Sequence, residues 1–308
     1  MEITAAVLKE PEIKRSHYLG GTDCAAILGL SRWKTPLQVW GEKTGLIEPE
    51  DISDRLAVKL GNRLEQAVAE LFTEETGLKV RRVNEPIFDR EYPFLGGRID
   101  RRVVGENSIV ECKTTSAWKA KEWESAEIPH EYILQVMHYL MVTGADKAYI
   151  AVLIGNQDFK WKEVLRDEAL IADIKAREIA FWKGFVETKI MPAQINKRDA
   201  ETLYSLYPVA AEGITVNLTD EAVRLIESRN ALIQDKIGLE GMIDQHENEI
   251  KALLKDAETG LAGKWKVTWK NQETNRFDTT RFKAEDPFTY NKFIKTTETR
   301  VLRIKEAA

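Results

Sequence analysis

Cysteine is scarce in this chain, and long apolar runs are missing from it. Only two of the 308 residues are cysteine, Cys24 and Cys112, and each lies inside an apolar segment. This count argues against a disulfide framework and a cysteine-based zinc site, so we expect both to be small core residues. No apolar run approaches the roughly 20 residues of a membrane span, and no signal-peptide pattern opens the sequence. We therefore expect no membrane association and a cytoplasmic location.

The chain also lacks a strong overall charge, but its charge is unevenly distributed. The formal net charge is -5. Residues 260–308 contain eleven Lys and Arg residues and six acidic residues, which leaves residues 1–259 with a net charge of -10. A basic segment that also carries aromatic residues can contact phosphate groups. The alternative, a tail that is merely solvated, is equally consistent with the sequence.

Two glycines precede Thr22 near the start of the chain, where a short apolar helix is expected. Thr22 is its predicted N-cap. Free backbone N–H groups at the helix start, with the Thr22 hydroxyl and the nearby Arg15, would suit an anion. This signal is weak by itself, because most capped helices bind no ligand. A second helix, predicted from Thr35 and Pro36 to Gly45, belongs to the scaffold.

A longer helix is predicted over residues 53–76 and places a carboxylate on its apolar face. That residue is Glu65, which shares the face with apolar side chains three and four positions away. A buried carboxylate needs an ion pair or a metal, because burying an isolated charge is too unfavourable. Glu65 is therefore either part of a metal site or the partner of Arg63 or Arg82.

Short segments rich in Val, Ile and Phe follow and predict β-strands. Their expected ranges are 79–83, 86–88, 95–104, 108–113 and 147–154. A turn signal at residues 105–107 predicts that the third and fourth strands form a hairpin. A helix over residues 130–143 precedes the last strand and carries Gln135 and Tyr139 on one face. This order predicts a mixed sheet flanked by helices.

The composition changes after the next two elements, a strand over residues 158–164 and an amphipathic helix over residues 167–189. Residues 193–218 have no sustained period and are predicted to be a linker. We therefore divide the chain into a core over residues 1–192, this linker, and an appendage over residues 219–308.

The appendage is expected to contain one long helix and one hairpin. Apolar residues recur at three-, four- and seven-residue steps over residues 219–257, which predicts a helix that packs on another helix or on a partner. Residues 264–270 alternate in the manner of a strand, and residues 277–282 are the predicted second strand of a basic β-hairpin.

The hairpin predicted over residues 95–113 brings two carboxylates and a lysine together. Asp100 and Glu111 lie side by side, and Lys113 shares a face with Glu111 because strand residues two apart point the same way. Two divalent ions can activate water, neutralise phosphoryl oxygens and stabilise the leaving oxygen of a phosphodiester. Mg²⁺ prefers oxygen ligands, which Asp100, Glu111 and the Cys112 carbonyl supply. Lys113 can orient the water or hold the phosphate, and a nearby metal would lower its pKa.

The same pattern also occurs in surface hairpins with an ordinary salt bridge, and taken alone it favours that alternative. Ile109 and Val110, however, make the second strand apolar and internal, where a charged pair without a function is unfavourable. Gly96 and Gly97 also permit a close approach to the backbone.

A known family shares this order of motifs. Glu65, Gly-Gly-Arg-Ile-Asp100, Ile-Val-Glu111-Cys-Lys113 and Gln135-Val-Met-His-Tyr139 follow one another as in the PD-(D/E)-X-K nuclease superfamily, which the chain resembles. Leu-Gly-Gly-Thr-Asp, Ala-Ala-Ile-Leu-Gly-Leu-Ser and Lys-Thr-Pro-Leu-Gln-Val-Trp resemble the opening of its YqaJ-like viral recombinase branch, related to lambda exonuclease. The resemblance covers about residues 15–190. Ile99 replaces the Pro of the superfamily name, a frequent substitution.

The resemblance implies a restriction-endonuclease-like core of the α/β (α+β) class. It also implies a metal-dependent 5′-to-3′ exonuclease on linear double-stranded DNA, which leaves 3′ single strands for an annealing protein in phage-type recombination. Mg²⁺ is the implied cofactor, with Mn²⁺ as a substitute. Family members form ring-shaped trimers around DNA, so a homo-oligomer is expected. If the chain is phage-encoded, its location is the host cytoplasm.

Motif positions imply the roles of the catalytic residues. Asp100 and Glu111 look like the metal ligands, with Glu65 as a helper near the second ion. Lys113 looks like the catalytic lysine, and Gln135 looks like the helix residue that positions water or the lysine.

Four further residues are implied to contact DNA. Tyr139 looks like the second member of the helix motif, close to the substrate. Arg15 and Thr22 stand at positions similar to those that hold the 5′-phosphate in the family, and Arg98 is a possible addition. A structure-specific or restriction-like endonuclease and a catalytically inactive DNA-binding recombination scaffold remain alternatives, although the complete set of catalytic residues argues against the inactive scaffold.

Overall fold

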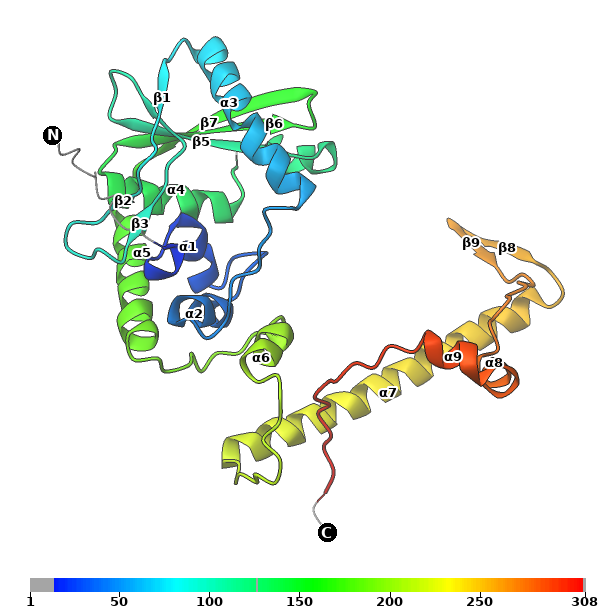
Figure 1. The fold of residues 1–308 in the computed structure, drawn as a ribbon. Helices are drawn as coiled ribbons and strands as arrows, with labels where there is room; N and C mark the ends of the chain where they lie inside the picture. Colours follow the sequence, from blue (N-terminus) through cyan, green and yellow to red (C-terminus); the bar gives the residue numbers. More distant parts are fainter. Residues whose placement is uncertain (1–13, 126, 307–308) are drawn as a thin grey trace. The chain divides into compact units, whose positions relative to one another are not determined.

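The computed structural model describes residues 14–125 and 127–306 and divides the chain into two compact units (Figure 1). The first unit extends to Pro208 and the second begins at Val209. Residues 193–218, the expected linker, contain a short helix, α6 (Ala200–Leu206). The hydroxyl of Thr35 donates a hydrogen bond to the buried Asp199 just before α6, so tertiary contacts attach this segment to the first unit.

A five-stranded mixed sheet forms the centre of the first unit, in the order β1-β4-β5-β6-β7. Its strands are β1 (Val80–Arg82), β4 (Arg101–Val103), β5 (Ser108–Thr115), β6 (Lys147–Ile154) and β7 (Asp158–Leu165). Only β5 and β6 run parallel to each other, and the other neighbours are antiparallel. The mixed sheet predicted from the sequence is confirmed.

The strand predicted over residues 95–104 is interrupted. Its first part, β3 (Gly96–Gly97), pairs with β2 (Ile87–Phe88) in a separate two-stranded sheet. The chain then bends before β4, and Asp100 lies in that bend rather than inside a strand. β4 and β5 nevertheless form the predicted antiparallel hairpin. The continuous strand was therefore a wrong prediction, because pairing with β2 draws the two glycines away from the main sheet.

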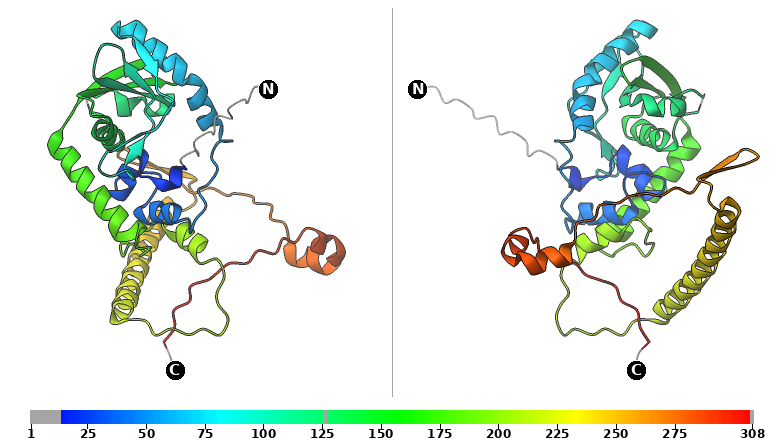
Figure 2. Two further views of the ribbon diagram at one scale, coloured as in Figure 1. Left: turned by 60° about the vertical axis from the view of Figure 1, so that its left-hand side comes forward. Right: turned by 90° about the vertical axis from the view of Figure 1, so that its right-hand side faces the viewer.

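Helices cover both faces of the sheet (Figures 1 and 2). Helix α3 (Leu56–Thr76) packs against β5 and β6 on one face. Helix α4 (His130–Thr143) lies on the other face, where it also contacts β2 and β3. Alternate residues of β6 show the two layers, because Tyr149 joins the core beneath α3 and Ile150 joins the core beneath α4. Both helices end where their predicted ranges end, and the residues that follow, Gly77 and Gly144, are their C-caps.

Three further helices accompany α4: the first and third pack directly on it, and the second packs on the first. They are α1 (Gly21–Ile27), α2 (Pro36–Thr44) and α5 (Glu168–Phe181), and α5 continues into a π-helical turn (Trp182–Val186). Short 3-10 helices, η1 (Arg15–His17) and η2 (Ala117–Trp123), precede α1 and α4. Helix α1 contacts α2, α4 and α5 directly. The N-terminal segment is thereby held at the same side of the sheet as α4.

The caps of α1 and α2 differ in how well the sequence predicted them. Thr35 caps α2 as expected, because its hydroxyl accepts a hydrogen bond from the Gln38 N–H at 3.2 Å. The N-cap of α1 is Gly20, not Thr22, and its N–H donates to the Asp23 carboxylate at 3.1 Å. Thr22 therefore lies within the first turn, and the predicted Thr22 cap is wrong because Asp23 supplies the polar group.

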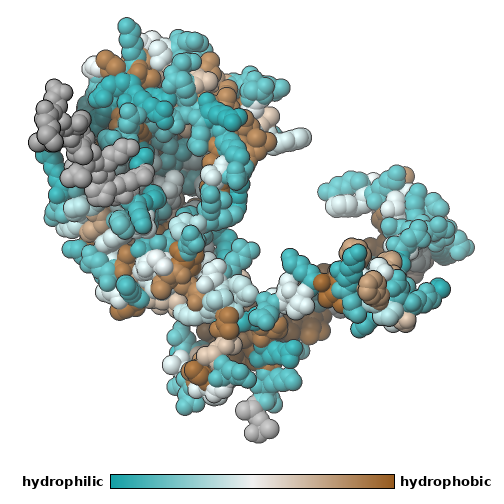
Figure 3. All heavy atoms as spheres, viewed as in Figure 1, coloured by the Kyte–Doolittle hydropathy of each residue, from teal (hydrophilic) through white to brown (hydrophobic). Residues whose placement is uncertain are grey.

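The second unit is dominated by α7 (Asp220–Leu254), which begins directly after Thr219, the first residue of the predicted helix range. None of its residues is buried in the described chain, and apolar side chains such as Leu232 and Ile243 are exposed. Figure 3 shows apolar residues at the surface of this unit. The prediction that α7 packs on a partner stays open. In the part of the chain that the structure describes, no helix is long and apolar enough to cross a membrane.

The hairpin of the second unit has a different second strand from the one predicted. β9 (Trp265–Thr268) pairs with β8 (Thr259–Ala262), across a turn in which Gly263 has φ 56°. Such a turn joins adjacent segments closely, so the nearer strand pairs. Residues 279–285 are instead helix α8 (Thr279–Glu285), which Asp278 caps, and α9 (Pro287–Lys292) follows it.

Candidate active site

Strand β5 and helix α4 bring three of the predicted catalytic residues into one hydrogen-bonded network. Glu111 and Lys113 lie two apart on β5, on the face that α4 covers. The Lys113 Nζ donates to Glu111 Oε1 at 2.7 Å and to Gln135 Oε1 at 3.0 Å. The Gln135 Nε2 in turn donates to Glu111 Oε1 at 2.7 Å. The structure thus gathers Glu111, Lys113 and Gln135 as the sequence predicted.

Asp100 faces the same network from the bend before β4. Its Oδ2 accepts a hydrogen bond from the Cys112 N–H at 2.8 Å, so β5 turns this edge toward Asp100 rather than toward another strand. The N–H and C=O of one residue point to the same side in a strand. The Cys112 carbonyl therefore points toward Asp100 from the same edge of β5. A carbonyl with this direction can serve as the predicted third metal ligand.

The two carboxylates of this centre repel each other. Burial and the charge of Glu111 raise the pKa of Asp100 to about 8, although the Cys112 N–H partly opposes the change. Burial lowers the pKa of Lys113, but the charge of Glu111 and its hydrogen bond outweigh that effect and raise it. One ammonium thus stands against two carboxyl groups in a mostly buried site. A divalent cation that took the place of the Asp100 proton would remove the repulsion between the two carboxyl groups.

The donor set fits Mg²⁺, which binds oxygen and commonly takes only one or two carboxylates from the protein. The available donors are the carboxylates of Asp100 and Glu111 and the carbonyl of Cys112. Among residues 14–125 and 127–306, no three His, Cys, Asp or Glu side chains are grouped so that they form a complete metal cluster. These donors would therefore share an ion with substrate oxygens and water, as is usual for Mg²⁺.

Glu65 reaches this region from α3 and forms an ion pair. Its partner is the buried Arg101 of β4, not Arg63 or Arg82. Arg101 also donates to the Asp100 carbonyl oxygen at 2.8 Å, and the charge of Glu65 contributes to the raised pKa of Asp100. Glu65 therefore lies near the carboxylates while its own charge is compensated. The sequence missed Arg101 because its role depends on the strand that places it opposite α3.

Tyr139 packs between two glycines that come from distant segments. A Cβ atom on Gly97 would lie 2.6 Å from Tyr139 Cε1, and one on Gly21 would lie 2.8 Å from it. The absence of side chains at both positions therefore admits the ring. The Tyr139 hydroxyl accepts a hydrogen bond from Gln135 Nε2 at 3.2 Å, and the side chain is buried. Tyr139 supports Gln135 from inside the protein.

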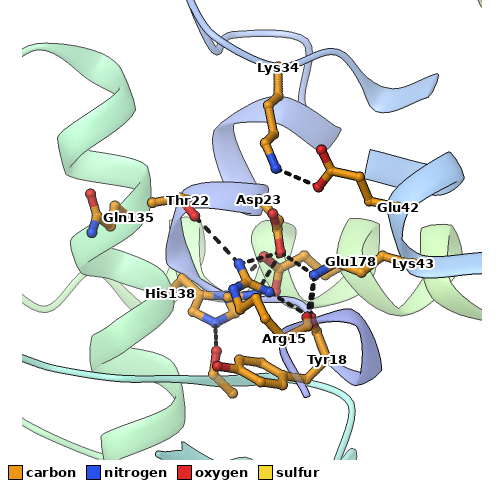
Figure 4. A network of polar contacts seen from close by, with 12 residues as sticks. Arg15, Tyr18, Thr22, Asp23, Lys34, Glu42, Lys43, Gln135, His138 and Glu178 are labelled. Atoms are coloured by element: carbon orange, nitrogen blue, oxygen red, sulfur yellow. Dashed lines mark hydrogen bonds and ion pairs between the residues drawn. The ribbon is translucent and has the colours of Figure 1, made fainter. Parts of the chain in front are cut away.

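A second charged cluster lies at the start of α1 (Figure 4). Arg15 contacts Asp23 Oδ2 at 2.5 Å and Thr22 Oγ1 at 3.4 Å, so the structure brings the predicted pair together. The sequence did not predict Lys43, whose Nζ lies 2.9 Å from the same oxygen of Asp23. Arg15, Thr22, Asp23 and Lys43 line part of a pocket of about 150 Å³.

Opposite charges compensate each other in this second cluster. Burial favours the neutral form of Asp23, but Arg15 and Lys43 outweigh it and lower the pKa of Asp23 to about 2. Burial lowers the pKa of Lys43 to about 8 despite the charge of Asp23. Two cations and one carboxylate leave one positive charge, and the Arg15 side chain is 45% exposed. An anion can therefore reach Arg15.

Comparisons with known proteins identify the family. A model of the YqaJ-like viral recombinase domain matches residues 13–146, a range that includes both clusters. A Bacillus subtilis (strain 168) protein that carries the name YqaJ is 41% identical over 300 residues, which cover 96% of this chain and 93% of that protein. The chain belongs to the YqaJ-like viral recombinase family.

Two solved structures also resemble this chain, at lower sequence identity than the Bacillus subtilis protein. An alkaline exonuclease (LHK-Exo) from Laribacter hongkongensis is 19% identical, with a TM-score of 0.49, and the match covers 61% of this chain and 96% of that chain. A phage-related exonuclease from Haemophilus somnus 129PT is 17% identical, with a TM-score of 0.43 and coverage of 56% and 95%.

Arg98 of this recombinase family member does not join either cluster. Its side chain is exposed, and within the described chain it has no hydrogen-bond or ion-pair partner. β3 pairs with β2 directly before it, so the position of Arg98 follows from the interruption of the predicted strand. A contribution of Arg98 to phosphate binding remains a prediction.

The side chains of the two cysteines belong to the core, as expected. Cys24 is buried, and Cys112 is partly buried.

Proposed function

We propose that this protein is a Mg²⁺-dependent deoxyribonuclease that digests linear double-stranded DNA from 5′ ends, with Mn²⁺ as a substitute metal. The observation that supports this most strongly is the convergence of Asp100 and Glu111 with Lys113 and Gln135 on one face of the sheet. An ordinary surface salt bridge would be exposed, whereas this network is mostly buried. A salt bridge would also not explain why Asp100 and Glu111 are held so close that the charge of Glu111 raises the pKa of Asp100. Membership in the recombinase family supports the same conclusion.

Each residue of the centre has a chemical task in this proposal. Divalent ions, when bound, supply charge neutralisation at the phosphoryl oxygens and an activated water. Asp100, Glu111 and the Cys112 carbonyl would hold them. The Lys113 Nζ donates hydrogen bonds to Glu111 and Gln135, and from this position it can also donate to a phosphoryl oxygen. Gln135 fixes the positions of both Lys113 and Glu111 by hydrogen bonds to each.

The Arg15 cluster supports a preference for DNA ends. A terminal 5′-phosphate carries more charge than an internal phosphodiester and has three oxygens that accept strong hydrogen bonds. Arg15 and Thr22 offer a guanidinium and a hydroxyl for such a group. Gly21, directly before Thr22, packs against both Gln135 and Tyr139, because a Cβ atom at Gly21 would lie within 3 Å of each. The Arg15 cluster is thus next to the side of α4 that carries Gln135.

The finer parts of the proposal concern products and assembly. Digestion from 5′ ends leaves 3′ single strands, which a single-strand annealing protein would receive in phage-type recombination. By family resemblance the active form is a ring-shaped trimer around the duplex, in the cytoplasm of the host cell. Light scattering during size-exclusion chromatography tests the trimer, and a monomer at working concentration would contradict it.

Digestion of end-labelled linear duplex tests the activity directly. We expect degradation in Mg²⁺, none in EDTA, and faster degradation of 5′-phosphorylated than of 5′-hydroxyl ends. A covalently closed circle should stay intact, and its cleavage would instead indicate a structure-specific or restriction-like endonuclease. Metal-independent binding without any digestion would indicate an inactive DNA-binding recombination scaffold.

A further inference from the structure

His138 and Glu178 form a fully buried pair between α4 and α5 (Figure 4). Both side chains are 0% exposed. The Nδ1 of His138, on α4, lies 2.9 Å and 3.0 Å from the two carboxylate oxygens of Glu178, on α5. The Nε2 lies 2.9 Å from the carbonyl oxygen of Gly96, in β3. One imidazole therefore joins three elements of the first unit.

The environment favours a protonated imidazole. Burial lowers the pKa of His138, but the charge and hydrogen bond of Glu178 and the Gly96 carbonyl outweigh that effect and raise it. Both ring nitrogens can then donate, one to a carboxylate and one to a carbonyl. The neighbouring group on α1 is the Cys24 thiol, whose pKa burial and Glu178 raise, so it stays neutral. The paired charges of His138 and Glu178 compensate each other.

The bond to Gly96 determines where the next residue lies. Gly97 follows Gly96 and packs against the ring of Tyr139. Tyr139 is the residue after His138 on α4. Tyr139 is hydrogen-bonded to Gln135, and Gln135 contacts both Glu111 and Lys113. A chain of contacts thus runs from Glu178 to the carboxylate centre without reaching solvent.

We propose that His138, held by Glu178, is a positioning residue that fixes β3 against α4 and thereby sets the placement of Tyr139 and Gln135. This proposal rests on the proposed nuclease function, because its effect is read at that centre. A displacement of about 1 Å at reacting groups can lower a rate a hundredfold. The hydrogen bond to Gly96 is therefore the part of the pair that matters for turnover, and the ion pair with Glu178 matters for holding the ring.

Two double variants isolate the contribution of the hydrogen bond to Gly96. Glu178→Gln is present in both, so that no unpaired charge is buried. His138→Gln places an amide near the position of Nε2 and can still donate to Gly96, whereas His138→Asn places it near Nδ1 and cannot. We expect the Asn variant to lose about tenfold in kcat relative to the Gln variant. KM for duplex ends should change by less than about twofold in both, because Arg15 is untouched.

Ile174→Ala is the matched control for lost stability. Ile174 is fully buried on α5, one turn before Glu178, and makes no polar contact with His138. Ile174→Ala should lower the melting temperature, but it should not lower kcat selectively while KM stays the same. Equal kcat values in the two double variants, or losses no larger than that of Ile174→Ala, would overturn the positioning role.

A measurement that does not depend on DNA digestion keeps the test of the positioning role separate from the test of the nuclease function. The ring resonance of Tyr139, assigned by its absence in Tyr139→Phe, should shift in the Asn double variant and stay in place in the Gln double variant. If the wild-type protein digests no duplex, the nuclease proposal fails, and this resonance still decides whether His138 positions Tyr139. An unchanged resonance in both double variants refutes the positioning.

Discussion

The carboxylate centre and the Arg15 cluster lie on the same side of one fold, yet their charges are balanced in opposite ways. In the centre, like charges are held together and the pKa of Asp100 rises to about 8. In the cluster, Asp23 lies between Arg15 and Lys43 and its pKa falls to about 2. In our proposal a divalent cation completes the first arrangement, whereas the charges of the second arrangement are largely compensated within the protein.

This difference in charge compensation predicts which cluster contributes to activity and which contributes to the stability of the fold. A group whose charge is uncompensated in the folded protein contributes little to folding, and its burial is explained by what it binds. A buried carboxylate with two cationic partners contributes to folding, and removal of one partner leaves an unpaired charge. Substitutions in the two clusters should therefore have opposite signatures.

The largest effect is expected at the carboxylate centre. Asp100→Asn and Lys113→Ala should each reduce digestion of linear duplex in Mg²⁺ by about a thousandfold or more, because a ligand or the phosphate contact is lost. The melting temperature of Asp100→Asn should not fall, since the substitution removes a repulsion. Initial rates and thermal unfolding measure the two quantities. Near wild-type digestion by either variant would refute the assignment.

Asp23→Asn should show the reverse pattern, with a loss of stability. The pKa of Asp23 is depressed in the folded protein, so its contribution is fully present above the ordinary carboxyl pKa and is lost as the pH falls through about 2. The shift corresponds to about 2 kcal/mol near neutral pH. Urea unfolding near neutral pH and at about pH 3 measures the change. A difference that does not shrink in acid would contradict the ion pairing.

Arg15→Gln tests whether the remaining positive charge of the second cluster serves DNA ends. The rate advantage of 5′-phosphorylated over 5′-hydroxyl duplex should fall by about tenfold, since a charged hydrogen bond to phosphate is lost. Digestion of 5′-hydroxyl ends should persist. Arg98→Gln, which removes an exposed arginine outside the cluster, is the comparison variant, because a contribution of Arg98 to phosphate binding is also still a prediction. A larger loss from Arg98→Gln would move the phosphate site away from Arg15.

The smallest effect concerns phosphate contacts outside both clusters. A chain that ends at Ala257 lacks the basic segment with β8 and β9, and it should bind duplex a fewfold more weakly in EDTA. The slope of log affinity against log salt should decrease by roughly 0.9 for each lost phosphate contact. Fluorescence anisotropy over a salt series measures both. Unchanged affinity and slope would indicate that the segment docks a partner protein instead.

Local patterns in the sequence predicted many of the elements. Helix α4 has the predicted range, α2 has the predicted Thr35 cap, and β4 and β5 form the predicted hairpin. These features depend on residues within one turn or one hairpin, where periodicity and turn chemistry act directly. The predicted mate of β9 was wrong because a closer segment competed for the same strand edge.

Residues that act across elements were missed for a common reason. Arg101 pairs with Glu65, Lys43 with Asp23, and His138 with Glu178, and each pair joins side chains that are distant in sequence. No short-range pattern marks such a partner, because the pair exists only after the two elements pack. The glycine pair was recognised as a place of close approach, but that Tyr139 is what approaches Gly97 was not predictable.

The sequence by itself determined the main helices and strands of the first unit and the family, and it placed Asp100, Glu111, Lys113, Gln135 and Tyr139 at motif positions. Spacing suffices for this, because strands and helices present side chains at fixed periods. Only the tertiary structure decided which charges are compensated. Compensation depends on burial and on the few ångströms between groups from different elements, which is why Asp23 and Asp100, two aspartates of one fold, differ so widely in pKa.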